Sequence, residues 1–459
     1  MLREDIAFHI RTLLSHPDAE AFDRLLRSAP VADIAESLRD TPPQQMARLL
    51  RPAPPKEAAT LFVALPDGVQ DAVLAELPPA TVTALVSAMP SDERADLYNR
   101  LDTAARQRLL PSLSQAERDD ILRLANYPEG TAGSAATSQY TTIDSGMTVQ
   151  AALRVIRATA PDKETIYVIY VVDSEGRLTG TVSLRDLVMA DDDVPLTSLV
   201  SASPVTVRAG DPDDRAAEHI RRYDLLAVPV VDGDDRMIGI VTVDDAMDID
   251  KEQDATQLAR YGGTATLGRG ADLDLKESTT RRIFGTRLLW LVILTVFGMI
   301  TSTFVSQQED LLAEVIVLAA FIAPIVDMGG NTGSQSATLV IRSMALGQLR
   351  LRWQDVWFVV RRECAVALAL GACVAVLEVV LANFTKSGLD TDVLLVVGLS
   401  MLICTALGGI IGAVLPFLAR RIGTDPATLS SPLITSIMDL LGVFVYFGLA
   451  YVFLGHLLA

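Results

Sequence analysis

The stretch that decides the fold is PATLSSPLITSIMDLLGVFVYFGLAYVFLGHLLA, which covers Pro426–Ala459. Asp439 is the one acidic residue in it, with thirteen residues before it and twenty after. A helix would therefore carry this carboxylate roughly 20 Å into a membrane-length segment. An ionised carboxylate at the centre of a bilayer costs at least about 2.5–3.5 kcal/mol, so such residues usually serve a function. The simplest function for Asp439 is to bind a cation.

The charge of the chain is divided unevenly. The 459 residues are 50% hydrophobic and carry a net charge of −18. Residues 281–459 hold eleven acids and eleven bases, whereas the first 280 residues hold 46 acids and 28 bases. An acidic soluble part is thus joined to an apolar part. The acidic part argues against nucleic-acid binding, which needs a basic surface. It suits divalent cations, although acidity also serves solubility.

The apolar part contains five stretches long enough to cross a membrane. Arginines gather before the first stretch, between the second and third, and between the fourth and fifth. The positive-inside rule then places the N-terminal part in the cytoplasm and the C-terminus outside. We expect a multi-pass protein of the plasma (inner) membrane. The predicted stretches are 287–305, 311–341, 356–383, 391–418 and 427–457.

Two of these stretches contain clustered glycines. The second carries DMGGNTGSQ at 327–335. We expect Gly329, Gly330 and Asn331 to interrupt this helix and to line a water-filled cavity, where free backbone carbonyls are tolerated. Asp327 lies beside this break and is a candidate for the same cavity as Asp439. In the fourth stretch, we expect the glycines to serve close helix packing; they are Gly408, Gly409 and Gly412.

The soluble part begins with a periodic signal. Prolines recur every twelve residues at positions 42, 54, 66, 78 and 90. Each is followed by about ten residues of helical pattern, which predicts a superhelical stack of short helices. Within one unit, Asp92 and Asp96 lie four residues apart on one helix face. Like charges at this spacing are unfavourable unless a cation bridges them, although a solvated face is the alternative.

A tandem repeat follows. VVDSEGRLTGTVSLRD at 171–186 aligns with VVDGDDRMIGIVTVDD at 230–245, an offset of 59 residues. Each copy predicts two strands, a turn and a helix, and the pair resembles two CBS domains, which are ligand-sensing modules. In CBS pairs that bind adenine nucleotides, the Gly-x-x-Ser/Thr-x-x-Asp pattern contacts a ribose. The alternative is that Ser183 and Thr242 only cap helices. Six acids between residues 244 and 254 then lie between this pair and the membrane part.

The whole order resembles the MgtE family of magnesium channels. The motifs GGNTGSQSAT at 329–338 and DPA at 425–427, with Ser430, Ser431 and Asp439 after it, carry the resemblance. It implies a multidomain protein with an N-terminal α-helical superhelical domain, an α/β tandem CBS pair, a connecting helix and a five-helix, all-α transmembrane domain. The implied boundaries are 1–135, 136–250, 251–280 and 281–459.

The resemblance also implies roles for individual residues. The family is a homodimer with its pore between subunits, and the position of Asp439 binds the permeating Mg²⁺. ATP can bind in the CBS pair, at positions matching Tyr170, Arg185 and Asp186. The implied pore lining includes Asp327, Gly329, Gly330, Asn331 and Ser431. The acids that sense cytosolic Mg²⁺ match Asp92, Asp96, Asp214, Asp224, Asp245 and Asp248.

The sequence also departs from the family pattern. The family usually has a small uncharged pair before the glycines, where this chain has Asp327 and Met328. Ser431 stands where an Asn occurs near the pore entrance. The connecting helix has fewer acids than the family pattern, which bears on the strength of magnesium gating.

Three hypotheses remain open from the sequence. The first is a dimeric magnesium channel, gated by Mg²⁺ bound between the N-terminal and CBS domains. The second is a proton-coupled secondary transporter of divalent cations, with Asp439 as a proton relay. The third is a CBS membrane sensor that conducts nothing. We do not expect an enzyme, because the chain has no P-loop and its four histidines form no catalytic grouping.

Overall fold

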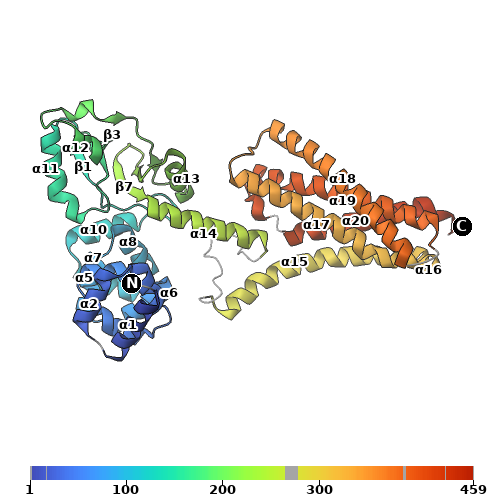
Figure 1. The fold of residues 1–459 in the computed structure, drawn as a ribbon, viewed down its shortest axis with the longest axis horizontal. Coiled ribbons are helices and arrows are strands. Elements are labelled where there is room, and N and C mark those ends of the chain that lie inside the picture. The colour runs from blue at the N-terminus through green and yellow to red at the C-terminus, as the bar shows by residue number, and fades with distance from the viewer. Residues whose placement is uncertain (1–2, 17, 264–277, 386–388, 429–430, 458–459) are drawn as a thin grey trace. The chain divides into compact units, whose positions relative to one another are not determined.

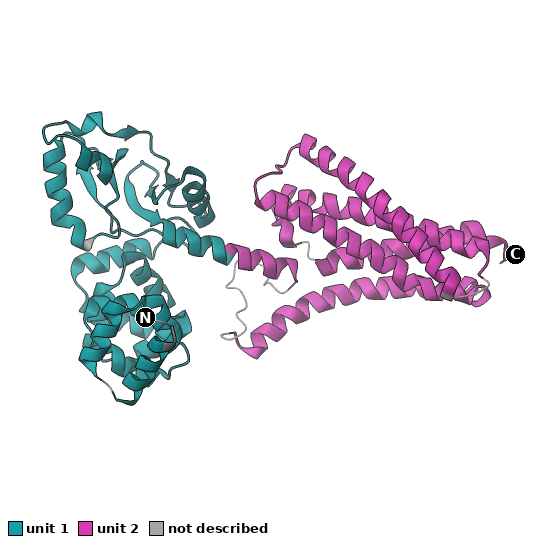
Figure 2. Ribbon diagram, in the orientation of Figure 1, with its two compact units in different colours: residues 1–252 teal, residues 253–459 magenta. Residues whose placement is uncertain are grey.

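The computed structural model describes residues 3–16, 18–263, 278–385, 389–428 and 431–457. The chain forms two compact units, Met1–Glu252 and Gln253–Ala459, which Figure 2 colours separately. The boundary between them falls inside one helix, α14 (Val243–Tyr261). The predicted connecting helix is therefore continuous with the last helix of the tandem repeat. Residues 264–277 of the predicted linker lie outside the described residues.

The first unit opens with short helices whose starts are set by the proline repeat. Each repeat proline is the residue immediately before a helix, with φ between −52° and −61°. This is the backbone angle that the proline ring imposes and that a helix start requires. The helices are α1 (Arg3–Ser15), α2 (Ala19–Ser28), α3 (Val31–Leu38), α4 (Pro43–Leu50), α5 (Pro55–Val63), α6 (Asp67–Glu76), α7 (Pro79–Ala88), α8 (Ser91–Arg100), α9 (Thr103–Leu109), η1 (Leu110–Ser112) and α10 (Gln115–Leu124).

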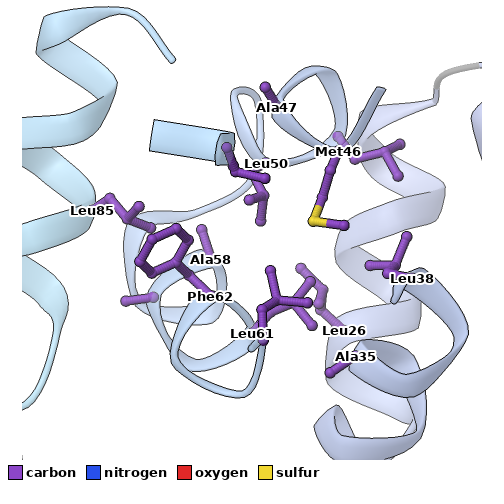
Figure 3. Close-up of a cluster of buried hydrophobic side chains, with 14 of the residues drawn as sticks. Leu26, Ala35, Leu38, Met46, Ala47, Leu50, Ala58, Leu61, Phe62 and Leu85 are labelled. Atoms are coloured by element: carbon purple, nitrogen blue, oxygen red, sulfur yellow. The ribbon is translucent and has the colours of Figure 1, made fainter. Parts of the chain in front are cut away.

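These helices stack in a regular way. A helix packs mainly on the helix two further along the chain, as α3 does on α5, α4 on α6 and α5 on α7. The core between them is apolar, and Met46, Leu61 and Phe62 are fully buried in it. Figure 3 shows these side chains in one cluster, in which Phe62 points toward Leu85. The stacking confirms the predicted superhelical domain.

The tandem repeat forms two sheets with the same internal register. In the first, β1 runs parallel to β2, and β2 pairs antiparallel with β3; in the second, β5, β6 and β7 repeat this arrangement. Gly180 pairs with Val171, and Gly239 pairs with Val230, 59 residues later in each case. The elements are β1 (Thr142–Asp144), α11 (Val149–Thr159), η2 (Ala160–Asp162), β2 (Val168–Val172), β3 (Leu178–Ser183), α12 (Leu184–Met189), η3 (Leu196–Ser198), β4 (Ser201–Ala202), β5 (Val207–Arg208), α13 (Asp213–Tyr223), β6 (Ala227–Val231) and β7 (Met237–Thr242).

The second unit contains, among the described residues, five helices long and apolar enough to cross a membrane. The five predicted spans are therefore confirmed, with one shift: residues 309–314 form a separate helix, and the second span begins at Ile316. The elements, of which Figure 1 labels the α-helices, are α15 (Thr280–Ser306), α16 (Glu309–Glu314), η4 (Ile316–Leu318), α17 (Ala319–Ala345), α18 (Trp353–Thr385), α19 (Thr391–Arg421), η5 (Pro426–Thr428), α20 (Ser431–Leu454) and η6 (Gly455–Leu457).

Glycines allow α17 and α19 to approach very closely. A Cβ added at Gly408 would lie 2.2 Å from the carbonyl oxygen of Gly329. A Cβ added at Gly412 would lie 2.0 Å from the carbonyl oxygen of Gly333. Backbone atoms cannot turn aside as a side chain can, so no larger residue fits at these positions. The packing role predicted for the glycines of the fourth span is confirmed.

The predicted break in the second span is wrong. Helix α17 runs without interruption through Gly329, Gly330 and Asn331. A Cβ at Gly329 would lie 3.1 Å from Met438, and one at Gly330 would lie 3.0 Å from Thr435, both on α20. A glycine inside a helix costs about 1 kcal/mol relative to alanine. Here the missing side chains let three helices pack at short range, and the helix stays intact.

We predict that Gly408→Ala destabilises the membrane unit. The added methyl group collides with the backbone of α17, and overpacking of this kind costs about 1–3 kcal/mol or more. The thermal unfolding midpoint of the detergent-solubilised protein is expected to fall by several degrees. Gly298→Ala in α15 is the matched control, because a Cβ there meets nothing within 4 Å. Equal midpoints for Gly408→Ala and the wild type would contradict the close-packing account.

Candidate functional site

Two rows of polar side chains face each other on α17 and α20. On α17 the polar residues recur every three or four positions, which places them on one side of the helix. We call the two rows together the polar face. Ser431 donates a hydrogen bond from its Oγ to Ser334 Oγ at 2.9 Å, which joins the rows near one end. The two ends of the α17 row, Asp327 and Thr338, are eleven residues apart, or roughly 16 Å along the helix. The polar face consists of Asp327, Asn331, Ser334 and Thr338 on α17 and Ser431, Thr435 and Asp439 on α20.

Two carboxylates lie at the other end of the polar face. Asp327 is close enough to Asp439 for their charges to repel each other. Asn331 donates a hydrogen bond from its Nδ2 to Asp327 Oδ2 at 2.9 Å, which fixes the orientation of that carboxylate. Asp327 and Asn331 are exposed in the protomer, and Asp439 is half-buried. The structure thus brings together the two acids that the sequence analysis assigned to one cavity.

The predicted pore glycines are buried between helices. Gly329 is buried against α19 and α20, on the opposite side of α17 from Asp327, whereas Gly330 is buried against Thr435 of α20, at the edge of the polar face. They support the polar face by allowing α17 and α20 to lie close together. Ser431, also predicted for the pore entrance, lies on the polar face itself.

The end of α14 contacts the polar face within the second unit. The Tyr261 hydroxyl donates to the carbonyl oxygen of Ser334 at 2.9 Å and lies 2.6 Å from Thr338 Oγ1. Beside it, Arg260 forms an ion pair with Asp425, in the loop between α19 and α20. We call these contacts the α14 latch. The sequence analysis did not identify them, because their partners are more than seventy residues apart.

A second cluster of acids lies in the first unit, where α8 meets the tandem repeat. Ser91, at the start of α8, lies 3.0 Å from Thr137 and accepts a hydrogen bond from the Ser138 amide at 2.7 Å. Arg123 of α10 donates to the Ile238 carbonyl of β7 at 3.1 Å. These contacts hold the acids of α8 near those of α14. The acidic surface comprises Asp92, Glu93 and Asp96 of α8, Glu164, and Asp245, Asp248 and Glu252 of α14.

The charges on the acidic surface are poorly compensated. Burial, followed by repulsion from Asp245 and Glu93, raises the pKa of Asp92 well above its usual range. The Oδ1 atom of Asp92 is buried and has no hydrogen-bond partner in the described part of the chain. Burial, followed by repulsion from Asp96 and Asp245, raises the pKa of Glu93 to about 7. Such a surface favours a bound cation or a proton.

The pKa of Asp96 is also raised by burial, although part of this side chain is exposed to solvent. Asp96 keeps an exposed surface, yet the surrounding helices withdraw enough water to raise its pKa to about 6. Burial also raises the pKa values of Asp245, Glu164 and Glu252.

The arrangement fits a hydrated cation better than a directly ligated one. Among the described residues, no group of three or more His, Cys, Asp or Glu side chains is close enough to hold a metal ion. Mg²⁺ releases its water reluctantly and often meets carboxylates through that water. Carboxylates spread over a surface can hold such an ion without converging on it.

The predicted sensing acids are only partly brought together. Asp92, Asp96, Asp245 and Asp248 lie on the acidic surface. Asp214 and Asp224 lie at opposite ends of α13, where Asp224 follows the last turn with a left-handed backbone. The sequence analysis missed Glu93, Glu164 and Glu252. Glu93 adjoins Asp92 and Glu252 belongs to the acidic run, but only the fold reveals Glu164.

The predicted nucleotide site is also divided. Arg185 and Asp186 are exposed at the start of α12, where Ser183 accepts a hydrogen bond from the Asp186 amide at 3.0 Å. This confirms the capping role considered for Ser183. Tyr170 is instead fully buried in the core against Tyr140, and burial raises its pKa. Its hydroxyl has no hydrogen-bond partner among the described residues. The structure therefore does not place Tyr170 on an open surface with Arg185.

Comparison with known families covers most of the chain. Residues 322–449 match MgtE, described as a divalent cation transporter, and residues 29–130 match the MgtE intracellular N domain. The two halves of the tandem repeat match the CBS domain at 132–193 and 196–252. These matches confirm the predicted fold class.

Similar proteins agree with the family matches. The magnesium transporter MgtE of Thermus thermophilus is 39% identical over 352 residues, which cover 76% of each chain. That of Enterococcus faecalis is 34% identical over 342 residues, covering 74% of this chain and 73% of the relative. Among solved structures, the soluble part of a magnesium transporter is 32% identical, with a TM-score of 0.52, and covers 55% of this chain and 99% of that one.

A second solved structure includes a ligand. It is the cytosolic domain of the Mg²⁺ channel MgtE in complex with ATP, 34% identical to this chain with a TM-score of 0.51. The similarity covers 53% of this chain and 99% of that one.

We predict that the stability of the first unit depends on pH. Because Glu93 and Asp96 have raised pKa values in the folded state, that state binds more protons than the unfolded chain between about pH 4 and 7. The stability that protonation of Glu93 and Asp96 gives to the folded state is therefore fully present at low pH. It is lost as the pH rises through about 7. Without divalent cations, the thermal unfolding midpoint of this unit should decrease as the pH rises from about 5 to 8. Added Mg²⁺ should restore the midpoint.

The variant Glu93→Gln should flatten this pH dependence, whereas Asp40→Asn, on an exposed turn away from the acidic surface, should not. Midpoints measured by scanning fluorimetry in EDTA and in Mg²⁺ test this. A midpoint that rises with pH in EDTA would refute the mutual repulsion of the carboxylates on the acidic surface.

Proposed function

This chain belongs to the MgtE family of magnesium transporters, and we propose that it is a dimeric magnesium channel whose ion pathway runs along the polar face past Asp439. As a member of a transporter family it is not an enzyme, as the sequence predicted. Its five apolar helices make it a multi-pass membrane protein that handles Mg²⁺ within a bilayer. We infer that the first unit is cytosolic, as in the related cytosolic domain.

The exposure of Asp327 and Asn331 on one protomer, beside the half-buried Asp439, supports the dimeric pathway. In hydrocarbon these groups are costly, so they need water or a second polar surface. Two copies related by a twofold axis supply that surface to each other, since the same patch then meets itself. Water enclosed between the two patches gives a path for a hydrated ion.

Asp439 suits Mg²⁺ for a chemical reason. Mg²⁺ keeps several waters in octahedral geometry, so carboxylates on two sides of a narrow path can hold it through those waters. Such binding is strong enough to admit the ion and weak enough to release it. Asp439 is therefore the residue on which this function depends most.

We predict that Asp439→Asn lowers Mg²⁺ flux into proteoliposomes by at least about tenfold, because the amide removes the charge that attracts the ion. Glu378→Gln on α18, outside the polar face, is the control and should keep its flux. Undiminished flux in Asp439→Asn would remove this residue from the pathway.

The two other hypotheses give different results in the same assay. A proton-coupled transporter would acidify or alkalinise the vesicle in step with Mg²⁺ entry. A non-conducting sensor would show no flux in the wild type.

We further propose that Mg²⁺ on the acidic surface closes the channel. The proposed sensing residues are Asp92, Asp96, Asp245 and Asp248, with Asp214 and Asp224 at the two ends of α13. Helix α14 carries two of these acids at its start and the latch residues Arg260 and Tyr261 at its end. A cation that relieves the repulsion among these carboxylates stabilises one position of α14. The α14 latch transmits that change of position to the polar face.

We predict that Tyr261→Phe, with or without Arg260→Gln, weakens the inhibition of flux by Mg²⁺ on the side of the soluble unit. The change removes the hydrogen bonds to Ser334 and Thr338 but keeps the ring. The control Arg421→Gln removes an exposed arginine at the end of α19. The inhibition curve, measured as flux against Mg²⁺ concentration, should shift to higher concentrations. An unshifted curve would exclude the latch as the link.

ATP is a proposed ligand of the CBS pair. The support is the related cytosolic domain solved with ATP and the exposure of Arg185 and Asp186, the positions that the family resemblance implies. Calorimetric titration of ATP into wild type and Arg185→Ala tests this, and equal heats would exclude the site.

A further inference from the structure

Helix α18 is longer than the membrane it crosses. Its 33 residues extend for about 50 Å, compared with roughly 30 Å of hydrocarbon. Residues 365–384 contain Glu378 as their one charged residue and fill the hydrocarbon by themselves. Residues 353–364 must therefore lie in the headgroup region and beyond it.

This first part of α18 presents large aromatic side chains to its surroundings. Trp353 is 79% exposed, Trp357 is 59% exposed and Phe358 is 58% exposed. Val356 and Val359, on the opposite side, are turned toward the protein. Tryptophan in membrane proteins favours the boundary between water and hydrocarbon, because its ring is apolar and its N–H is polar. The exposed side therefore fits a headgroup layer.

Two arginines continue the same side one turn further along. Arg361 and Arg362 are exposed, and no acidic side chain in the described part of the chain pairs with either. The nearest acids are already engaged: Glu363 accepts a hydrogen bond from Ser336 at 2.7 Å, and Asp355 accepts one from the Arg350 amide at 2.9 Å. Side chains on a helix lean toward its N-terminus, so both guanidinium groups point back toward the aromatic rings.

We propose that this aromatic–arginine face of α18 binds anionic phospholipids of the bilayer. Arg361 and Arg362 would hold the headgroup phosphate, and Trp353, Trp357 and Phe358 would pack against the glycerol and upper acyl region. Charge complementarity selects an anionic lipid over a zwitterionic one, since a zwitterionic headgroup carries its own compensating cation. The inference rests on α18 crossing the bilayer and not on the proposed ion pathway.

Tryptophan fluorescence tests the proposal directly. The chain has three tryptophans, and Trp290 is buried, so the variant Trp290→Phe leaves Trp353 and Trp357 as the only reporters. The full-length protein is reconstituted in phosphatidylcholine vesicles that contain either brominated phosphatidylglycerol or brominated phosphatidylcholine at equal mole fraction. We expect the anionic quencher to quench at least about twofold more, because it is enriched next to the face.

Arginine variants in the same background separate specific binding from general attraction to the membrane. The quenching ratio is the quenching by brominated phosphatidylglycerol divided by that by brominated phosphatidylcholine. Arg361→Gln with Arg362→Gln should bring this ratio to one. Arg361→Lys with Arg362→Lys should keep most of the excess over one. Arg281→Gln with Arg282→Gln, at the start of α15, should leave the ratio unchanged. Unaltered Mg²⁺ flux shows that the variants are folded. Equal quenching by both lipids in the background protein, or an unchanged ratio after loss of Arg361 and Arg362, would overturn the proposal.

Discussion

The close contact of α17 with α19 is the constraint on which the membrane unit depends. Gly329 and Gly333 meet Gly408 and Gly412 with no side chain between the two backbones. One side of α17 is thereby committed to helix packing. The polar residues of the same helix, such as Asp327 and Asn331, must then lie on the opposite side, where α20 contributes Asp439. Helix packing thus determines where a polar pathway can exist in this protein.

Helix α14 connects the repelling carboxylates of the acidic surface with the ion pair and hydrogen bonds of the α14 latch. At its start, Asp245 adds to an acidic surface whose charges repel one another and raise the pKa values of neighbouring carboxyl groups. At its end, Arg260 and Tyr261 bond to the loop and helix beside the polar face. We propose that a cation bound at the acidic surface acts on the contacts at the other end through this helix. Coupling of this kind requires that the cation bind one arrangement more tightly than the other.

Much of the fold could be predicted from the sequence because its signals are local. The proline spacing predicts the helix starts from α4 to α8, and the offset of 59 residues predicts equal register in the two sheets. The break in α17 could not be judged in the same way. Clustered glycines indicate either a broken helix or a tightly packed one, and the choice depends on α19, eighty residues away.

The candidate sites were predicted less completely. Asp439 and Asp327 stand out because a charge in an apolar stretch is locally unusual, and the structure brings them together. Tyr170 matches a nucleotide-binding position by sequence, yet its strand turns that side chain into the core. Glu164 and the α14 latch join residues far apart in the chain, so no local pattern could reveal them. The domain boundaries predicted at residues 135, 250 and 280 stay predictions.

We propose that ions pass along the polar face of α17 and α20. Cysteine accessibility tests it most directly, in a protein whose own cysteines at positions 364, 373 and 404 are replaced. The variants Asn331→Cys and Thr435→Cys place a thiol on the polar face, and Val292→Cys places one on the exposed side of α15. We predict that a charged thiol reagent blocks Mg²⁺ flux in the first two variants, that Mg²⁺ slows the reaction, and that the α15 variant is unaffected. Flux that persists after complete modification at both polar-face positions would contradict it.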